Sequence, residues 1–241
     1  MTTDARIYSF SRLTTWKTCK QSFKRCYIDG DRGEDGFFNT FGTLGHSVFE
    51  KIDRGQLAPT QAYEEWSSRY DTEVVPHTQG WMDNWKAGAD RFFQNFKGWR
   101  TEPVWVEEHF VLDMDGYRFQ GYVDRLGMAA NGDLIMTDYK CAKPFTGDKL
   151  KEKARQLYLY AGAVQKRFGE WPKRLIFFHF VQGVPTIVPF KLEDYEEAVQ
   201  WADRTVRDIE TYSGNYPMED NGYFCEAVCG YRNSCEKRFD G

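Results

Sequence analysis

Apolar residues recur at helical spacing through the first hundred residues of the chain. A segment that opens with cap-type serines predicts a helix over about 9–29. Residues 41–53 carry apolar positions three and four residues apart and predict a second helix. The stretch 60–97 is rich in Trp and Phe and is interrupted by Pro76, so it predicts two more helices.

After residue 103 the pattern changes to short runs rich in Val, Ile, Phe and Tyr. Asp115-Gly116 and Asn131-Gly132 are turn signals between such runs. Two later segments return to helical spacing. The expected strands cover 104–112, 117–128, 134–140, 174–181 and 184–190, and the expected helices cover 148–168 and 192–212. This order predicts an α/β fold, a mixed sheet flanked by helices.

We expect one domain over residues 1–241. It would have a helical part (1–100), a part that bears the sheet (101–212) and a cysteine-rich tail (213–241). With 241 residues and 17% aromatic residues, the chain can bury a substantial core.

The charge balance gives no overall signature for nucleic acid, because the net charge is −4. Any DNA binding must therefore rest on local patches. Two basic runs, over 17–25 and 143–155, are candidates, and solvated helix faces would give the same pattern. No apolar run is long enough to span a bilayer, and no signal peptide opens the chain. We expect a cytoplasmic protein with no membrane partner.

Cysteines gather near the two ends of the chain. In a reducing compartment they are metal ligands or free thiols rather than disulfides. Four thiolates can hold an iron–sulfur cluster or a zinc ion. Cys26 is an alternative ligand, and no role is predicted for Cys141. The four candidate ligands are Cys19, Cys225, Cys229 and Cys235. A group joining them would close a very large loop and act as a structural staple.

Two carboxylates and a lysine lie on neighbouring predicted strands. Asp138 and Lys140 are two residues apart, so they point to the same face of a strand, and Asp124 lies on the strand before. Two carboxylates can bind a divalent cation, and a lysine beside them can orient water or stabilise a phosphate. These groups together suit phosphodiester hydrolysis. The alternative is that they are solvent-facing residues of an ordinary sheet.

The turn at Asn131-Gly132 constrains this site. A strict two-residue loop would place Asp124 opposite Tyr139 and point it away from Asp138. We therefore predict a loop with an odd number of residues, or a β-bulge.

Two helices carry further candidates. His46 and Glu50 share one helical face, and His46 follows two glycines that would let the backbone approach a neighbour. His46 is a candidate third metal ligand, although a surface histidine on a capped helix would look the same. Gln156 and Tyr160 share a face of a later helix and can contact a phosphate, a base or the lysine. His77, His109 and His179 are assigned to structure.

The order of these motifs resembles the RecB-like branch of the PD-(D/E)xK nuclease superfamily, with its restriction-endonuclease-like fold. The motifs are Gly-x-x-x-His, Gly-x-x-Asp, Asp-x-Lys and Gln-x-x-x-Tyr. The opening Ser-x-Ser-Arg-Leu segment and the cysteine tail are similar to those of iron–sulfur exonucleases of this branch, which include CRISPR-associated and phage-encoded enzymes. The tail spacing Cys225-x-x-x-Cys229 departs from the family's usual Cys-x-x-Cys, and Lys20 replaces its usual proline.

The resemblance implies a role for each matched position. His46, Asp124, Asp138 and the Tyr139 carbonyl would bind Mg²⁺ or Mn²⁺, and Lys140 would be the catalytic lysine. Gln156 and Tyr160 would complete the catalytic motif. The four cysteines named above would hold a [4Fe–4S] cluster, with zinc as the alternative.

The expected function is a metal-dependent DNA exonuclease acting on single-stranded ends. Recombination or CRISPR-adaptation proteins are expected partners, and the oligomeric state is left open. The alternatives are an endonuclease on the same fold, a non-catalytic DNA-end-binding or scaffold subunit, and a zinc-stapled interaction protein.

Overall fold

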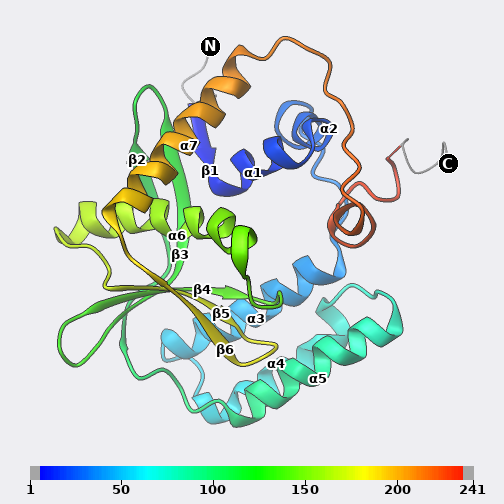
Figure 1. Ribbon diagram of the computed structural model, residues 1–241. Helices are drawn as coiled ribbons and strands as arrows, with labels where there is room; N and C mark the ends of the chain where they lie inside the picture. Colours follow the sequence, from blue (N-terminus) through cyan, green and yellow to red (C-terminus); the bar gives the residue numbers. More distant parts are fainter. Residues whose placement is uncertain (1–5, 236–241) are drawn as a thin grey trace.

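The centre of the protein is a six-stranded mixed sheet with helices on both faces (Figure 1). The structure is a computed structural model, and it describes residues 6–235. The sheet has both parallel and antiparallel pairs, as the alternation of strand and helix patterns predicts. Its strands are β1 (Ile7–Ser9), β2 (Glu102–Asp113), β3 (Arg118–Met128), β4 (Leu134–Lys140), β5 (Arg174–His179) and β6 (Val184–Pro189).

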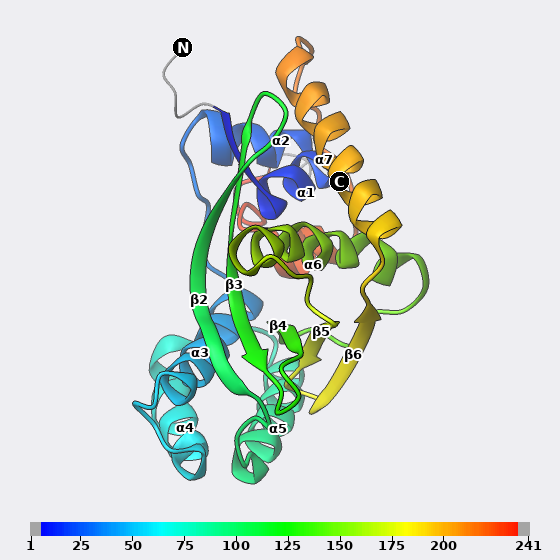
Figure 2. The same ribbon diagram turned by 90° about the vertical axis from the view of Figure 1, so that its left-hand side faces the viewer.

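Strand β3 organises the sheet. One edge pairs antiparallel with β2 along nearly its whole length, and the two form a long ribbon (Figure 2). The other edge pairs with β1 through 118–120 and with β4 through 125–128. Residues 121–124 of β3 thus have no strand partner on that edge among the described residues, and the sheet forks there.

Helices pack two separate apolar cores against the sheet. Helices α1, α6 and α7 share one core with β3 and β4, and helices α3, α4 and α5 enclose the other around Tyr139 and Phe180. The helices of four or more residues, in chain order, are α1 (Phe10–Thr18), α2 (Lys20–Phe23), the π-helical turn η2 (Lys24–Ile28), α3 (Phe37–Asp53), α4 (Ala62–Glu73), α5 (Gln79–Asn95), α6 (Gly147–Phe168), α7 (Leu192–Thr211) and the π-helical turn η4 (Phe224–Val228).

The expected helix over 9–29 has the predicted serine cap, but it is not continuous. Its first residue, Ser9, ends strand β1 and caps α1, accepting a hydrogen bond from the Arg12 amide. Farther on, Cys19 adopts an extended conformation and separates α1 from α2. Trp16 on α1 and Phe23 on α2 are both buried, with ring centroids 5.0 Å apart, so apolar spacing continues across this break and does not reveal it.

The expected odd-numbered loop between β3 and β4 is confirmed. Ala129 and Asp133 close the hairpin, so three residues form the loop, with Gly132 at φ 86°. The ladder ends at the pair Arg125–Thr137, and in this register Asp124 and Asp138 are the next residues of the two strands. One extra loop residue therefore turns both carboxylates toward a common site.

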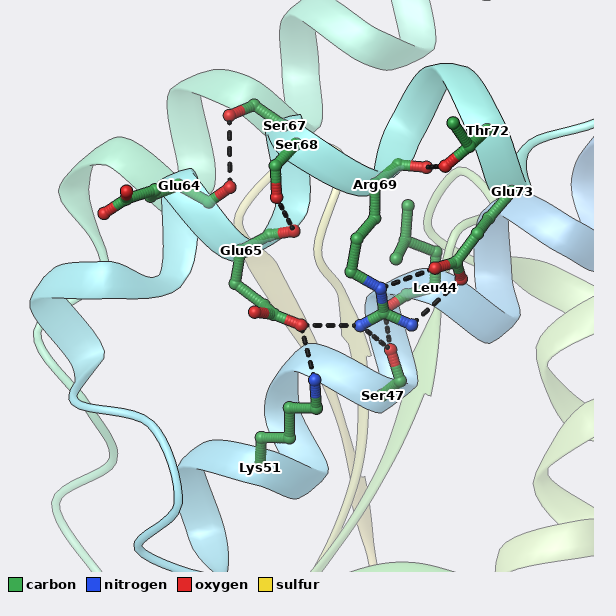
Figure 3. A network of polar contacts seen from close by, with 10 residues as sticks. All are labelled: Leu44, Ser47, Lys51, Glu64, Glu65, Ser67, Ser68, Arg69, Thr72 and Glu73. Atoms are coloured by element: carbon green, nitrogen blue, oxygen red, sulfur yellow. Dashed lines mark hydrogen bonds and ion pairs between the residues drawn. The ribbon is translucent and has the colours of Figure 1, made fainter.

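A polar network attaches α4 to the outer face of α3 (Figure 3). Lys51 Nζ lies 2.6 Å from Glu65 Oε1, and the Arg69 guanidinium donates to Glu65 and to the Ser47 hydroxyl. Ser47 follows His46, so this network helps to fix the helix that carries the histidine. None of the helices over the described residues is long and apolar enough to cross a membrane.

Candidate active site and cysteine cavity

The fork in the sheet brings together an imidazole and two carboxylates. His46 from α3, Glu107 from β2 and Asp124 from β3 have ligand atoms that all lie within 4.8 Å of one another. His46 and Glu107 line a groove of about 540 Å³ that runs along α3 between Phe38 and Glu50. Oxygen-rich sites with one imidazole suit a hard divalent cation, so the donor set fits Mg²⁺ or Mn²⁺.

The hydrogen bonds of His46 orient its ring. Its Nε2 donates to the Tyr139 carbonyl at 2.9 Å, and its Nδ1 lies 3.4 Å from Glu107 and 3.6 Å from Asp124. Burial alone would lower the pKa of His46, but the neighbouring carboxylates raise it to about 9. Burial and the nearby Asp138 raise the pKa of Asp124 to about 7. Without a cation, protons offset the crowded negative charge.

Asp138, Lys140 and Gln156 form a second group beside the first. Lys140 Nζ lies 2.6 Å from Asp138 Oδ2 and 3.3 Å from Gln156 Oε1, and Gln156 Nε2 donates to Asp138 Oδ1 at 2.8 Å. Asp124 Oδ2 accepts the Tyr139 amide at 2.7 Å, which joins the two groups across the fork. Burial opposes the charge on Lys140, but Asp138 raises its pKa, so the lysine is a cation.

The remaining predicted residues of the site lie at different depths. The Tyr139 carbonyl lies at the site but accepts from His46, while its ring is buried in the α3–α5 core. Tyr160 packs beneath β3, where its ring occupies the space that a side chain at Gly121 would need. Glu50 pairs with Arg54 at 2.8 Å. Cys141 lines the groove, and burial raises the pKa of its thiol to about 11.

Sequence reasoning missed Glu107. It lies between Val106 and Glu108, which pair with Arg125 and Val123 on either side of Asp124. It is the one non-glycine residue with positive φ, 48°, in the described chain. This backbone conformation is unfavourable for glutamate, and strained residues of this kind cluster at functional sites. A signal was present in the sequence, since Glu107 and Glu108 interrupt an otherwise apolar strand pattern opposite the predicted Asp124.

The predicted close approach at the glycines before His46 is found at Gly45. A Cβ there would lie 2.6 Å from the buried Phe180 ring, whereas a Cβ at Gly42 would lie 3.6 Å from Cys141 Sγ. We expect Gly45→Ala to cost about 1–3 kcal/mol of stability through overpacking and to weaken metal binding by moving His46. Gly42→Ala should be neutral or stabilising, by up to about 1 kcal/mol.

Thermal melting of both glycine variants, with and without Mn²⁺, tests this expectation. Equal melting temperatures for the two variants would contradict the close contact between α3 and Phe180.

All four predicted cysteine ligands line one cavity of about 460 Å³. Backbone amides of Ser22 and Asn221 donate to Cys19 Sγ and Cys225 Sγ at 3.5 and 3.4 Å. Burial opposes thiolate formation at Cys19, but hydrogen bonds from its surroundings lower its pKa. Cys26 is not among the residues that line the cavity, so the geometry favours Cys19 over it.

The cavity joins the two ends of the chain. Gln21 N donates to the Pro217 carbonyl at 3.1 Å, Asn221 Nδ2 donates to the Thr18 carbonyl at 2.6 Å, and Glu34 N donates to the Gly230 carbonyl at 2.8 Å. Figure 1 shows the C-terminal segment beside α2 and above α3. The two sequence regions that carry the cysteines therefore meet in space, as a common ligand would require.

The basic runs are partly neutralised. In the first run, Lys17, Lys24 and Arg25 each pair with an aspartate. In the second, Arg155 pairs with Glu197, and Lys149 is exposed. Neither run forms a clear patch on its own.

Comparison with known proteins places this geometry in a family. The model of the PD-(D/E)XK nuclease superfamily matches residues 7–236. A crystal structure of a candidate exonuclease from Eubacterium rectale is similar in fold, with a TM-score of 0.51 and 12% identity, covering 96% of this chain and 89% of that one. The crystal structure of SSO0001 has a TM-score of 0.38 and 16% identity over 80% of this chain and 84% of that one, too low to support an argument. No curated protein sequence matches the chain. Because the family model spans nearly the whole sequence, the protein belongs to the PD-(D/E)XK nuclease superfamily.

Proposed function

We propose that the protein is a metal-dependent DNA exonuclease of the RecB-like branch that acts on single-stranded ends. The observation that carries the proposal is the adjacency of His46, Glu107 and Asp124 to the Asp138–Lys140 pair, beside a groove that His46, Glu107 and Lys140 line. A binding subunit has no need for a buried lysine beside a set of cation ligands, so this arrangement favours catalysis.

His46, Glu107 and Asp124 would hold Mg²⁺ or Mn²⁺, and Asp138 would join them from across the fork. A cation there would lower the pKa of a water molecule and polarise a phosphate oxygen. Asp138 is the residue that ties the two groups together, because its carboxylate lies between Lys140 and Gln156 and its charge affects both His46 and Asp124.

Lys140 would orient the attacking water and stabilise the charge that develops on the phosphate. Gln156 holds both Lys140 and Asp138, so it fixes the lysine's direction before the substrate arrives. Tyr160 supports β3 from beneath at Gly121 and would act through position rather than by contact with the phosphate.

Digestion of end-labelled single- and double-stranded DNA tests the proposed activity. We expect Mg²⁺- or Mn²⁺-dependent shortening from an end, abolished by EDTA and by Asp124→Asn, which removes a ligand charge. Cleavage inside a circular single strand would instead identify an endonuclease. DNA binding without cleavage in any metal would identify a non-catalytic end-binding subunit.

We further propose that Cys19, Cys225, Cys229 and Cys235 hold a [4Fe–4S] cluster as a structural staple. Backbone amides donate to two of these sulfurs, Cys19 Sγ and Cys225 Sγ, and hydrogen bonds to the sulfurs are among the contacts by which a protein tunes an iron–sulfur cluster. Zinc on the same four thiolates is the alternative.

Cys229→Ala should remove the cluster, because Cys229 is a buried thiol of the cavity. The anaerobically purified variant should lose the brown absorbance of the wild type and melt at a lower temperature, since ligand binding of this kind contributes folding free energy. Cys26→Ala is the matched control and should stay brown. A brown Cys229→Ala variant with unchanged melting would refute the assigned ligands.

A further inference from the structure

We infer that Tyr122, held by His109, is a stacking platform for a nucleobase next to the scissile phosphate. This inference rests on the proposed nuclease function and adds how the site would select single strands. Tyr122 lies two residues before Asp124 on β3, and His109 lies two residues after Glu107 on β2. The two are direct cross-strand partners. Two residues of a strand span about 6.7 Å, so this row of cross-strand partners lies about that far along the β2–β3 ribbon from Glu107 and Asp124.

The Tyr122 ring is exposed to solvent on one face of the β2–β3 ribbon. Its side chain faces away from α6, because its neighbours Gly121 and Val123 contact or face the α6 core. Tyr122 is 56% exposed, one of the most exposed large apolar residues of the described chain. Figure 2 shows α6 on one side of the β2–β3 ribbon, with no helix drawn against the middle of its other side.

The ring is nevertheless held in place. The His109 and Tyr122 ring centroids are 4.8 Å apart at an interplanar angle of 44°. His109 Nε2 donates to Gln120 Oε1 at 3.2 Å, so its own orientation is fixed by a residue on the adjacent row. A platform fixed before binding loses little side-chain entropy when a ligand stacks on it.

A nucleobase is the ligand that fits this ring. If a phosphate lies at the metal site, a base attached to that nucleotide or to its neighbour is within reach of the next row. Stacking on an aromatic ring tolerates every base, as a nuclease of general specificity requires. In a duplex the faces of internal bases are already stacked on their neighbours, so the platform favours a single strand.

Binding of an unlabelled thymidine oligonucleotide in EDTA, where no cleavage occurs, tests the inference. Tyr122→Ala should weaken binding about 5- to 150-fold, the effect of losing one base–aromatic stack. Tyr122→Phe should bind like the wild type, because it keeps the ring. Ile187→Ala is the matched control, since Ile187 is 53% exposed on β6 at the far edge of the same sheet.

Abasic substitutions locate the contact. One abasic position near the end of the oligonucleotide should weaken wild-type binding as much as Tyr122→Ala does, and should have no further effect in that variant. Wild-type affinity in Tyr122→Ala, or an equal abasic effect in both proteins, would overturn the inference and leave the ring as a surface for another protein. If the wild type cleaves DNA and Tyr122→Ala binds it normally, the stacking role of Tyr122 is wrong and the nuclease proposal stands. If the wild type neither binds nor cleaves DNA, both the stacking role and the nuclease proposal are wrong.

Discussion

Lys140→Ala should lower the rate of DNA cleavage by at least about 10²- to 10³-fold, the usual effect of removing one positioned group that stabilises transition-state charge. Lys140 is held at 2.6 Å from Asp138 and is a cation, so its ammonium is already oriented before a phosphate arrives. Alanine cannot replace either the charge or the hydrogen bond to Gln156. Single-turnover cleavage of an end-labelled single strand measures the loss directly.

Lys143→Ala is the control for this prediction. Lys143 lies three residues farther along the chain and is exposed, so its removal tests general loss of positive charge near the groove. It should reduce the rate only slightly. Melting in Mn²⁺ should show both variants folded, and Lys140→Ala should stay brown. Cleavage by Lys140→Ala at the wild-type rate would refute the lysine's assignment.

The sheet was largely predictable from the sequence. The alternating runs predicted β2 to β6 to within two residues, with β4 at its observed bounds, whereas the short strand β1 was not predicted. The side-chain period of two predicted an odd-numbered loop or a β-bulge before Asp138, and the structure has the odd-numbered loop. Such inferences succeed where one local rule decides the structure.

The residues that sequence reasoning missed depend on contacts between distant segments. Glu107 joins the candidate metal site because of a positive φ that no composition rule predicts, and because β2 runs beside Asp124. The break at Cys19 follows from the cavity it shares with the C-terminal tail. His109 had been assigned to structure, since nothing in its local sequence predicts that Tyr122 faces it across the ribbon.

Arg125→Met should destabilise the protein by about 3–5 kcal/mol, the cost of leaving a buried charge without its partner. Arg125 is 2% exposed and directly follows Asp124 on β3. Its Nε lies 3.0 Å from Asp53 Oδ1, and its two terminal nitrogens donate to the Thr101 hydroxyl and carbonyl. Burial already raises the pKa of Asp53 despite Arg125. Without the arginine that pKa rises further, so the penalty should be largest above neutral pH and should shrink as acid protonates the carboxyl.

Urea unfolding measures this effect, and two variants separate its causes. Arg54→Ala removes a cation from the exposed i,i+4 pair with Glu50 and should cost no more than about 0.5 kcal/mol. Asp53→Leu combined with Arg125→Met removes both charges and should be more stable than Arg125→Met alone, because no unpaired carboxylate remains. A loss of unfolding free energy below about 1 kcal/mol in Arg125→Met would be far less than a buried ion pair should cost. In that case the Arg125–Asp53 pair does not hold α3 against β3. The position of His46 over Asp124 would then need another support.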